Sequence, residues 1–209
     1  MGDAPIQITL VIVVLNVVFS IAGFGNERLL KRYLFNPVTI RQNNQWERFL
    51  TSGFLHGGWL HLFINMFVLY QFGAFVERNF RRIFDGSGHF EFVTMYLGAL
   101  IISELPSYYK HRNNPNYNSL GASGAVAAVL FAFILFKPWW MLYLFGLIPI
   151  PAVVFGALYL FYSARMARQS QDAINHDAHF WGALFGFGFT GLLEPRLLLE
   201  FLKKLVSVI

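Results

Sequence analysis

The sequence predicts an all-α polytopic membrane protein, in which six transmembrane helices form a bundle within a single domain over residues 1–209. The first observation is composition, since 56% of the residues are apolar, enough for roughly six spans of about 20 residues each. The second is charge, since only 13% of the residues are charged, about half the share usual in soluble domains. A soluble domain of this size could not bury so much apolar surface.

The third observation is that the apolar residues gather in six stretches, each of which is interpreted as one membrane span. The third stretch is the least apolar, because Glu104 and Pro106 lie near its end. The fifth starts at Pro149, because proline breaks a helix, and residues 139–148 before it are expected to be interfacial. The segment 197–209 is expected to lie along the membrane surface. The six spans are predicted at residues 6–24, 59–76, 92–109, 119–136, 149–162 and 178–193.

The basic residues favour a lipid bilayer over a nucleic acid as the surroundings of the chain. The formal net charge is +5, but no basic run exceeds two residues. Scattered Arg and Lys between apolar stretches are typical of contacts with lipid head groups, so no nucleic-acid partner is expected. Residues 1–7 lack the basic region of a signal peptide, and the first stretch is therefore expected to be retained as a span. The absence of cysteine excludes disulfides and thiolate chemistry.

Polar side chains cluster at the start of the second, fourth and sixth stretches. The second carries His61 and Asn65, whose spacing of four places both on one helix face. The fourth opens with residues 121–124 and the sixth with residues 175–179. Because consecutive spans alternate in direction, these three spans run the same way and their clusters meet at one membrane face. Polar groups inside a span are costly, so the layer indicates a functional site.

The residue types in this layer point to nucleophilic acyl transfer. Ser123 and His179 form the minimal pair for that chemistry, in which the imidazole takes the proton of the hydroxyl. Gly182 and Gly186 share a helix face with His179, and small residues at this spacing let membrane helices approach closely. His61 and Asn65 could then donate hydrogen bonds to a developing oxyanion.

These motifs resemble those of the rhomboid family of intramembrane serine proteases. That family shares Gly-x-Ser-Gly at the fourth span, His-x-x-x-Asn in the second and Ala-His-x-x-Gly-x-x-x-Gly in the sixth, which correspond here to 121–124, 61–65 and 178–186. The resemblance extends from Gln45 to Glu194. It implies a six-helix rhomboid-like bundle, in which small residues and short polar motifs surround a site at one membrane face.

The resemblance also implies a mechanism. Ser123 would be the nucleophile and His179 the general base, while His61, Asn65 and the Ser123 backbone N–H would form the oxyanion hole. The expected substrates are transmembrane segments of membrane proteins, cleaved without a cofactor or a metal ion. The expected location is a bacterial cell membrane, with the chain as a multi-pass integral protein.

Two positions depart from the family pattern. The family commonly has an aromatic ring four residues after the nucleophile, against the base, whereas this chain has Ala127. The family often has Trp-Arg in the first connection, whereas this chain has Trp46-Glu47-Arg48. The first departure bears on the orientation of His179 and the second on the anchoring of the first connection.

Other residues near the site are assigned no chemistry. Asp177 lies two positions from His179, so it points about 200° away on a helix, and it is expected to cap the sixth helix. A Ser–His dyad is therefore expected rather than a triad. His56 and His176 are expected to be interfacial polar residues.

Three other readings remain open on the same residues. A metal site could be built from four histidines, His56, His61, His176 and His179. An inactive rhomboid-like protein could bind and retain membrane clients, although the presence of both Ser123 and His179 argues against it. A small transporter would need polar residues across the whole bilayer, and these stay at one face. An aspartyl intramembrane protease is excluded, because every aspartate lies outside the predicted spans. A zinc protease with a His-Glu-x-x-His motif is excluded, because no histidine is directly followed by a glutamate.

Overall fold

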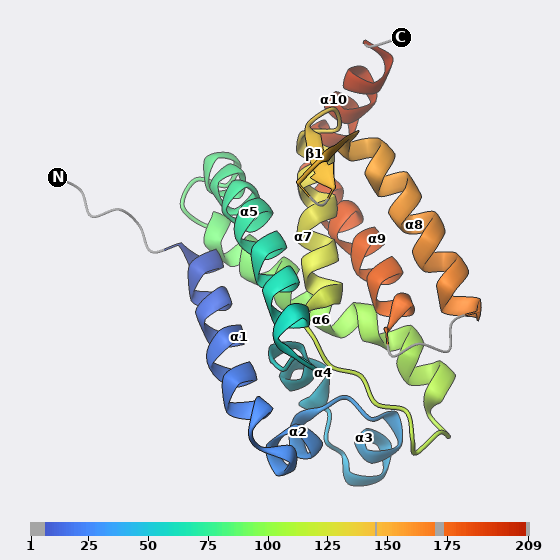
Figure 1. Cartoon of the computed structure of the whole chain (residues 1–209). Coiled ribbons are helices and arrows are strands. Elements are labelled where there is room, and N and C mark those ends of the chain that lie inside the picture. The colour runs from blue at the N-terminus through green and yellow to red at the C-terminus, as the bar shows by residue number, and fades with distance from the viewer. Residues whose placement is uncertain (1–6, 145, 170–173, 208–209) are drawn as a thin grey trace, which may run out of the picture.

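A computed structural model describes residues 7–144, 146–169 and 174–207, which are mostly helical (Figure 1). Each predicted span overlaps one long helix, although the helix ends differ by several residues. By length and hydropathy alone, α5 (Trp59–Ile83) stands out among the described helices as one that could cross a membrane, while α1 and α7 are apolar but shorter. The other long helices are α1 (Ile8–Phe24), α6 (Gly88–His111), α7 (Ser123–Phe136), α8 (Ala152–Gln169) and α9 (His176–Leu193).

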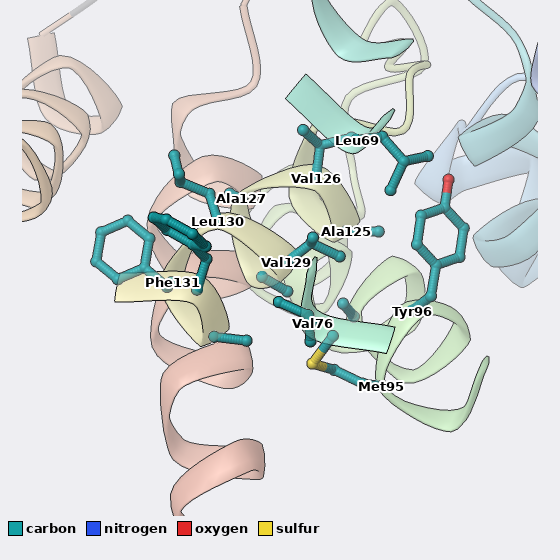
Figure 2. Packing of buried hydrophobic residues seen from close by; sticks show 14 of the residues in the cluster. Leu69, Val76, Met95, Tyr96, Ala125, Val126, Ala127, Val129, Leu130 and Phe131 are labelled. Atoms are coloured by element: carbon teal, nitrogen blue, oxygen red, sulfur yellow. The ribbon is translucent and has the colours of Figure 1, made fainter. Parts of the chain in front are cut away.

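Helix α7 is the centre of the bundle. All of its residues from Gly124 to Phe136 are buried, as expected for a helix that is apolar on every side. It packs most extensively against α9 and also against α5 and α6. Figure 2 shows Val126 of α7 beside Leu69 of α5, and Val129 of α7 beside Val76 of α5. Figure 1 shows that α5, α7 and α9 run in the same direction, as the alternation of spans predicts.

The connection between α1 and α5 folds into short helices at the end of the bundle where α5, α7 and α9 begin (Figure 1). The buried Arg48 holds this connection together. Its Nη1 donates to the carbonyl oxygen of Leu34 at 2.6 Å and its Nε to Gln45 Oε1 at 2.7 Å. The displaced arginine therefore still anchors the connection. The short helices are α2 (Glu27–Tyr33), α3 (Pro37–Asn43), α4 (Arg48–Thr51) and the 3₁₀ turn η1 (Ser52–Phe54).

The opposite end carries a β-hairpin and a final helix, α10 (Pro195–Val206). Strands β1 (Met141–Leu144) and β2 (Ile148–Pro151) pair antiparallel. The hairpin corrects the predicted start of the fifth span, because α8 begins at Ala152 and not at Pro149. Proline lacks the N–H that a helix interior requires, and it is tolerated at the edge of a two-stranded sheet.

Candidate active site

Ser123 is the first residue of α7, whereas the span predicted here begins four residues earlier, at residue 119. The preceding chain is held extended, because Ser119 and Phe35 exchange two backbone hydrogen bonds of 2.9 and 3.0 Å. Gly121 then turns the chain with φ of +124°, a conformation that other residues rarely adopt. The first N–H groups of a helix have no partner within it, and the helix dipole favours negative charge there. Ser123 thus lies where backbone N–H groups can donate hydrogen bonds to an oxyanion.

His179 lies in the first turn of α9, whose start is fixed by Asn175. The Asn175 side chain accepts a hydrogen bond from the Ala178 backbone N–H at 3.1 Å and so caps the helix. The predicted cap at Asp177 is therefore wrong. The Asp177 carboxylate lies within the first turn and pairs with Lys110 Nζ at 2.8 Å. Asn175 directly precedes the helix, as an N-cap must, and its amide is held there by Ser107 and Glu104 of α6.

Helices α7 and α9 touch backbone to backbone beside the two predicted catalytic residues. A methyl group placed on Gly182 would collide with the carbonyl oxygen of Gly124, and one placed on Gly186 would collide with that of Ala128. The carbonyl oxygen of Ala178 is 3.4 Å from the position that a Gly124 Cβ would occupy. The residues adjacent to Ser123 and to His179 are therefore in contact, as the small residues predicted.

An aromatic ring covers His179 although Ala127 supplies none. The ring of Tyr159 from α8 is stacked on the His179 imidazole, with 6.1 Å between centroids and 23° between planes. Tyr159 was not among the predicted site residues. No sequence pattern marked Tyr159 as functional, because an aromatic residue in an apolar helix is normally a packing residue.

His61 faces the turn that leads into Ser123. Its Nδ1 accepts a long hydrogen bond of 3.5 Å from the Gly57 backbone N–H, which favours the tautomer with the proton on Nε2. That Nε2 is 2.9 Å from the place that a Cβ on Gly121 would occupy. Only glycine fits here, and the ring can present an N–H donor to the start of α7.

Asn65 lies one turn further along α5 and is buried. Its Nδ2 donates to the carbonyl oxygen of His61 at 2.9 Å. An amide nitrogen carries two hydrogens, so one remains for another acceptor. The four predicted site residues thus come from the starts of α5, α7 and α9.

His56 and His176, predicted as interfacial polar residues, both have side chains buried within the protein. The Ser20 hydroxyl donates to the Phe54 carbonyl oxygen, so the 2.9 Å contact between His56 and Ser20 is donated by His56 Nδ1–H. Burial, and secondly the neighbouring His61, lowers the pKa of His56 to about 3. His56 meets the His61 ring edge-on with centroids 4.9 Å apart. At neutral pH, His56 is therefore an uncharged ring that packs against His61.

The four histidines pair in two places rather than one. His56 contacts His61, and His176 contacts His179 with ring centroids 5.9 Å apart. Within the described ranges, no group of three or more His, Asp or Glu side chains is placed to hold a metal ion. The structure gives no support to the four-histidine metal site.

The fold and these residues define a helical membrane protein with a polar layer at the starts of three parallel helices. Residues 43–196 match the Rhomboid domain, and the chain belongs to the rhomboid family. It is therefore an integral membrane protein. Members of this family act in membranes with protein partners. This match confirms the resemblance inferred from the motifs, which extended from Gln45 to Glu194.

Individual relatives agree with this assignment. The chain is 31% identical over 164 residues to Rhomboid-like protein 11, chloroplastic, of Arabidopsis thaliana, covering 71% of this chain and 53% of that protein. It is 29% identical over 173 residues to Presenilin-associated rhomboid-like protein A, mitochondrial, of Danio rerio, covering 78% and 41%. It is 32% identical over 152 residues to Presenilin-associated rhomboid-like protein, mitochondrial, of Homo sapiens, covering 67% and 36%.

The chain spans about half or less of the length of these relatives. Their names place them in chloroplasts and mitochondria. The relatives therefore do not support the expected location in a bacterial cell membrane. That expectation had little basis, since the motifs of the membrane domain carry no information on the compartment.

Proposed function

We propose that this protein is an intramembrane serine endopeptidase that cleaves transmembrane segments of membrane-protein substrates with a Ser123–His179 dyad. The observation that carries the proposal is the glycine-lined contact of α7 and α9, since it joins Gly124 and Ala178, the neighbours of the two residues. A contact this close between backbones supports a site in which the two side chains act on one substrate carbonyl.

The reaction follows from the chemistry of these groups. Ser123 Oγ attacks the carbonyl carbon of the scissile peptide while His179 takes the hydroxyl proton. The negative oxygen that forms accepts hydrogen bonds from the Ser123 backbone N–H, His61 Nε2–H and Asn65 Nδ2–H. The C–N bond then breaks as the His179 imidazolium protonates the leaving amine. Water, deprotonated by His179, hydrolyses the acyl-enzyme and regenerates the serine.

The dyad proposed here gives no catalytic role to Asp177. The carboxylate nearest in sequence, Asp177, is paired with Lys110 at 2.8 Å. The Tyr159 ring instead covers one face of the imidazole. Packing against this ring contributes to the orientation of the imidazole.

The proposal places the site within the membrane rather than at its surface. It takes α1, α5, α6, α7, α8 and α9 as six spans of a single domain. At 1.5 Å per residue, the 14 residues of α7 extend about 21 Å, whereas the hydrocarbon core is about 30 Å thick. Because the exposed Lys137 follows directly after α7, one end of the helix is at an interface. Ser123 then lies about 9 Å below the other.

The preferred substrate is a membrane helix that unwinds readily near the cut. A helical peptide carbonyl is held in a hydrogen bond to the residue four positions on, and Ser123 can attack only when that bond is open. Gly and Pro weaken a helix by about 1 and about 3 kcal/mol relative to Ala. Replacing Gly or Pro near the cut with Leu should slow cleavage of a model helix steeply and of a short unstructured peptide far less. Equal loss for both would show that side-chain recognition controls selection.

The deciding experiment is labelling with a serine-directed fluorophosphonate, together with cleavage of a transmembrane substrate, in purified protein. Ser123→Ala should abolish labelling, and both Ser123→Ala and His179→Ala should abolish cleavage. Ser163→Ala, a buried serine on α8, is the matched control and should retain both activities. Turnover by Ser123→Ala protein would refute the mechanism. Binding of a membrane client without labelling or cleavage would favour the inactive client-binding reading.

A further inference from the structure

A buried polar cluster connects α6 to the segments that carry Ser123 and His179. We call it the Glu104 cluster. The Glu104 carboxylate accepts hydrogen bonds from Ser119 Oγ at 3.1 Å and from Asn175 Nδ2 at 2.9 Å. Glu104 is only 7% exposed, and a buried carboxylate is tolerated when such donors satisfy it. The cluster comprises Glu104, Ser107, Ser119 and Asn175.

Asn175 is fully engaged by this cluster. Its Nδ2 donates to Glu104 and also contacts Ser119 Oγ at 3.2 Å. Its Oδ1 accepts from Ser107 Oγ at 2.9 Å and from the Ala178 backbone N–H at 3.1 Å. An amide has two donors and one acceptor oxygen, so every position is used. The side chain that caps the helix of His179 is therefore fixed by α6.

Ser119 connects the same carboxylate to the nucleophile. It lies four residues before Ser123, and its backbone is held by Phe35 on the far side. Its hydroxyl donates to one oxygen of the Glu104 carboxylate, while Asn175 donates to the other. One rigid group thus holds the start of α7 and the start of α9 at a fixed separation.

We propose that Glu104 is a positioning residue, whose carboxylate sets the distance between Ser123 and His179 by holding both helix starts. The inference rests on the proposed function. Glu104 touches neither reacting group, so its loss moves the dyad without removing a catalytic atom. A misplacement of about 1 Å in a catalytic group can cost about 10²-fold in rate. The change falls on kcat, because the surfaces that bind a substrate helix are untouched.

The test compares Glu104→Ala, Glu104→Gln and Glu91→Ala in the full chain. Gln can accept from Asn175 and donate to Ser119 Oγ, so it should retain kcat within about threefold, whereas Ala should lower kcat about 10- to 100-fold with KM unchanged. Glu91 is on the same helix but accepts from Ser87 at the other end, and its removal should leave kcat unchanged. Loss of kcat in Glu104→Gln equal to that in Glu104→Ala would overturn the inference.

Hydrogen exchange gives a readout that does not require activity. The amides of residues 178–180 and 119–121 should exchange faster in Glu104→Ala than in the parent protein, and not in Glu91→Ala. Unchanged exchange at both segments overturns the inference, whether or not the parent protein is active. If exchange changes as expected but the parent protein is inactive, only the proposed function fails. If Glu104→Ala does not fold, Ser119→Ala replaces it and should lower kcat about 3- to 10-fold; unchanged kcat there also overturns the inference.

Discussion

Adding one methyl group to the contact between α7 and α9 should separate the two helices and disable the site. The change is Gly186→Ala, because a Cβ at this position would collide with the Ala128 carbonyl oxygen. That atom belongs to a helix backbone and cannot rotate away, so α7 or α9 must move. Gly188→Ala on the same helix is the matched control, since a Cβ there meets no atom within 4 Å.

The magnitude follows from two opposing contributions to the free energy of unfolding. Overpacking a close contact costs about 1–3 kcal/mol, while Gly→Ala in a helix gains about 1 kcal/mol. The gain is common to both variants and cancels in their difference. Gly188→Ala should therefore be more stable than Gly186→Ala by about 2–3 kcal/mol. We expect the upper part of the overpacking range because the Ala128 carbonyl oxygen belongs to rigid backbone.

Activity should follow the same order. Gly186 is two turns from His179 on α9, so a helix displaced there carries the base away from Ser123. We expect kcat to fall by about 10²-fold per ångström of displacement, with Gly188→Ala unchanged. Unfolding in mixed micelles and kcat for a transmembrane substrate measure the two effects. Equal stability and equal kcat for the two variants would show that the close contact of α7 and α9 does not exist as described.

Three further outcomes test the groups around the dyad. Asn65→Ala should lower kcat about 10²–10³-fold, the usual effect of one oxyanion donor, and an unchanged acylation rate would contradict that role. Tyr159→Phe should keep the stacked ring on His179 and retain kcat, whereas Tyr159→Ala should lower it about tenfold; equal kcat for both would contradict positioning by the ring. The folded protein holds the pKa of His56 at about 3, below its ordinary value, so the unfolded chain binds more protons between about pH 3 and 6.5. Stability should fall as the pH drops through that window by up to about 1.4 kcal/mol per unit, and His56→Gln should lose this contribution, so identical slopes in denaturation at each pH would contradict it.

The sequence was sufficient to predict where the long helices lie and that α7 meets α9. Apolar stretches of helical length mark each long helix, and Gly182 and Gly186 at a spacing of four predicted the contact of α9 with α7 that the structure contains. It could not give the helix ends. Ser123 begins α7 because Ser119 is held by Phe35, a residue far away along the chain. The cap of α9 is Asn175 rather than Asp177 for a similar reason, since α6 holds that amide.

Membership of the rhomboid family, the parallel direction of α5, α7 and α9 and the small residues at their contact were determined by the sequence itself, because they depend on local composition and on spacing along one helix. Tyr159 over His179, His56 behind His61 and Glu104 between Ser119 and Asn175 were decided only by the tertiary structure. Each of these contacts joins residues on different elements. The side-chain direction that creates it depends on how the helices pack, and no pattern within a single segment records that packing.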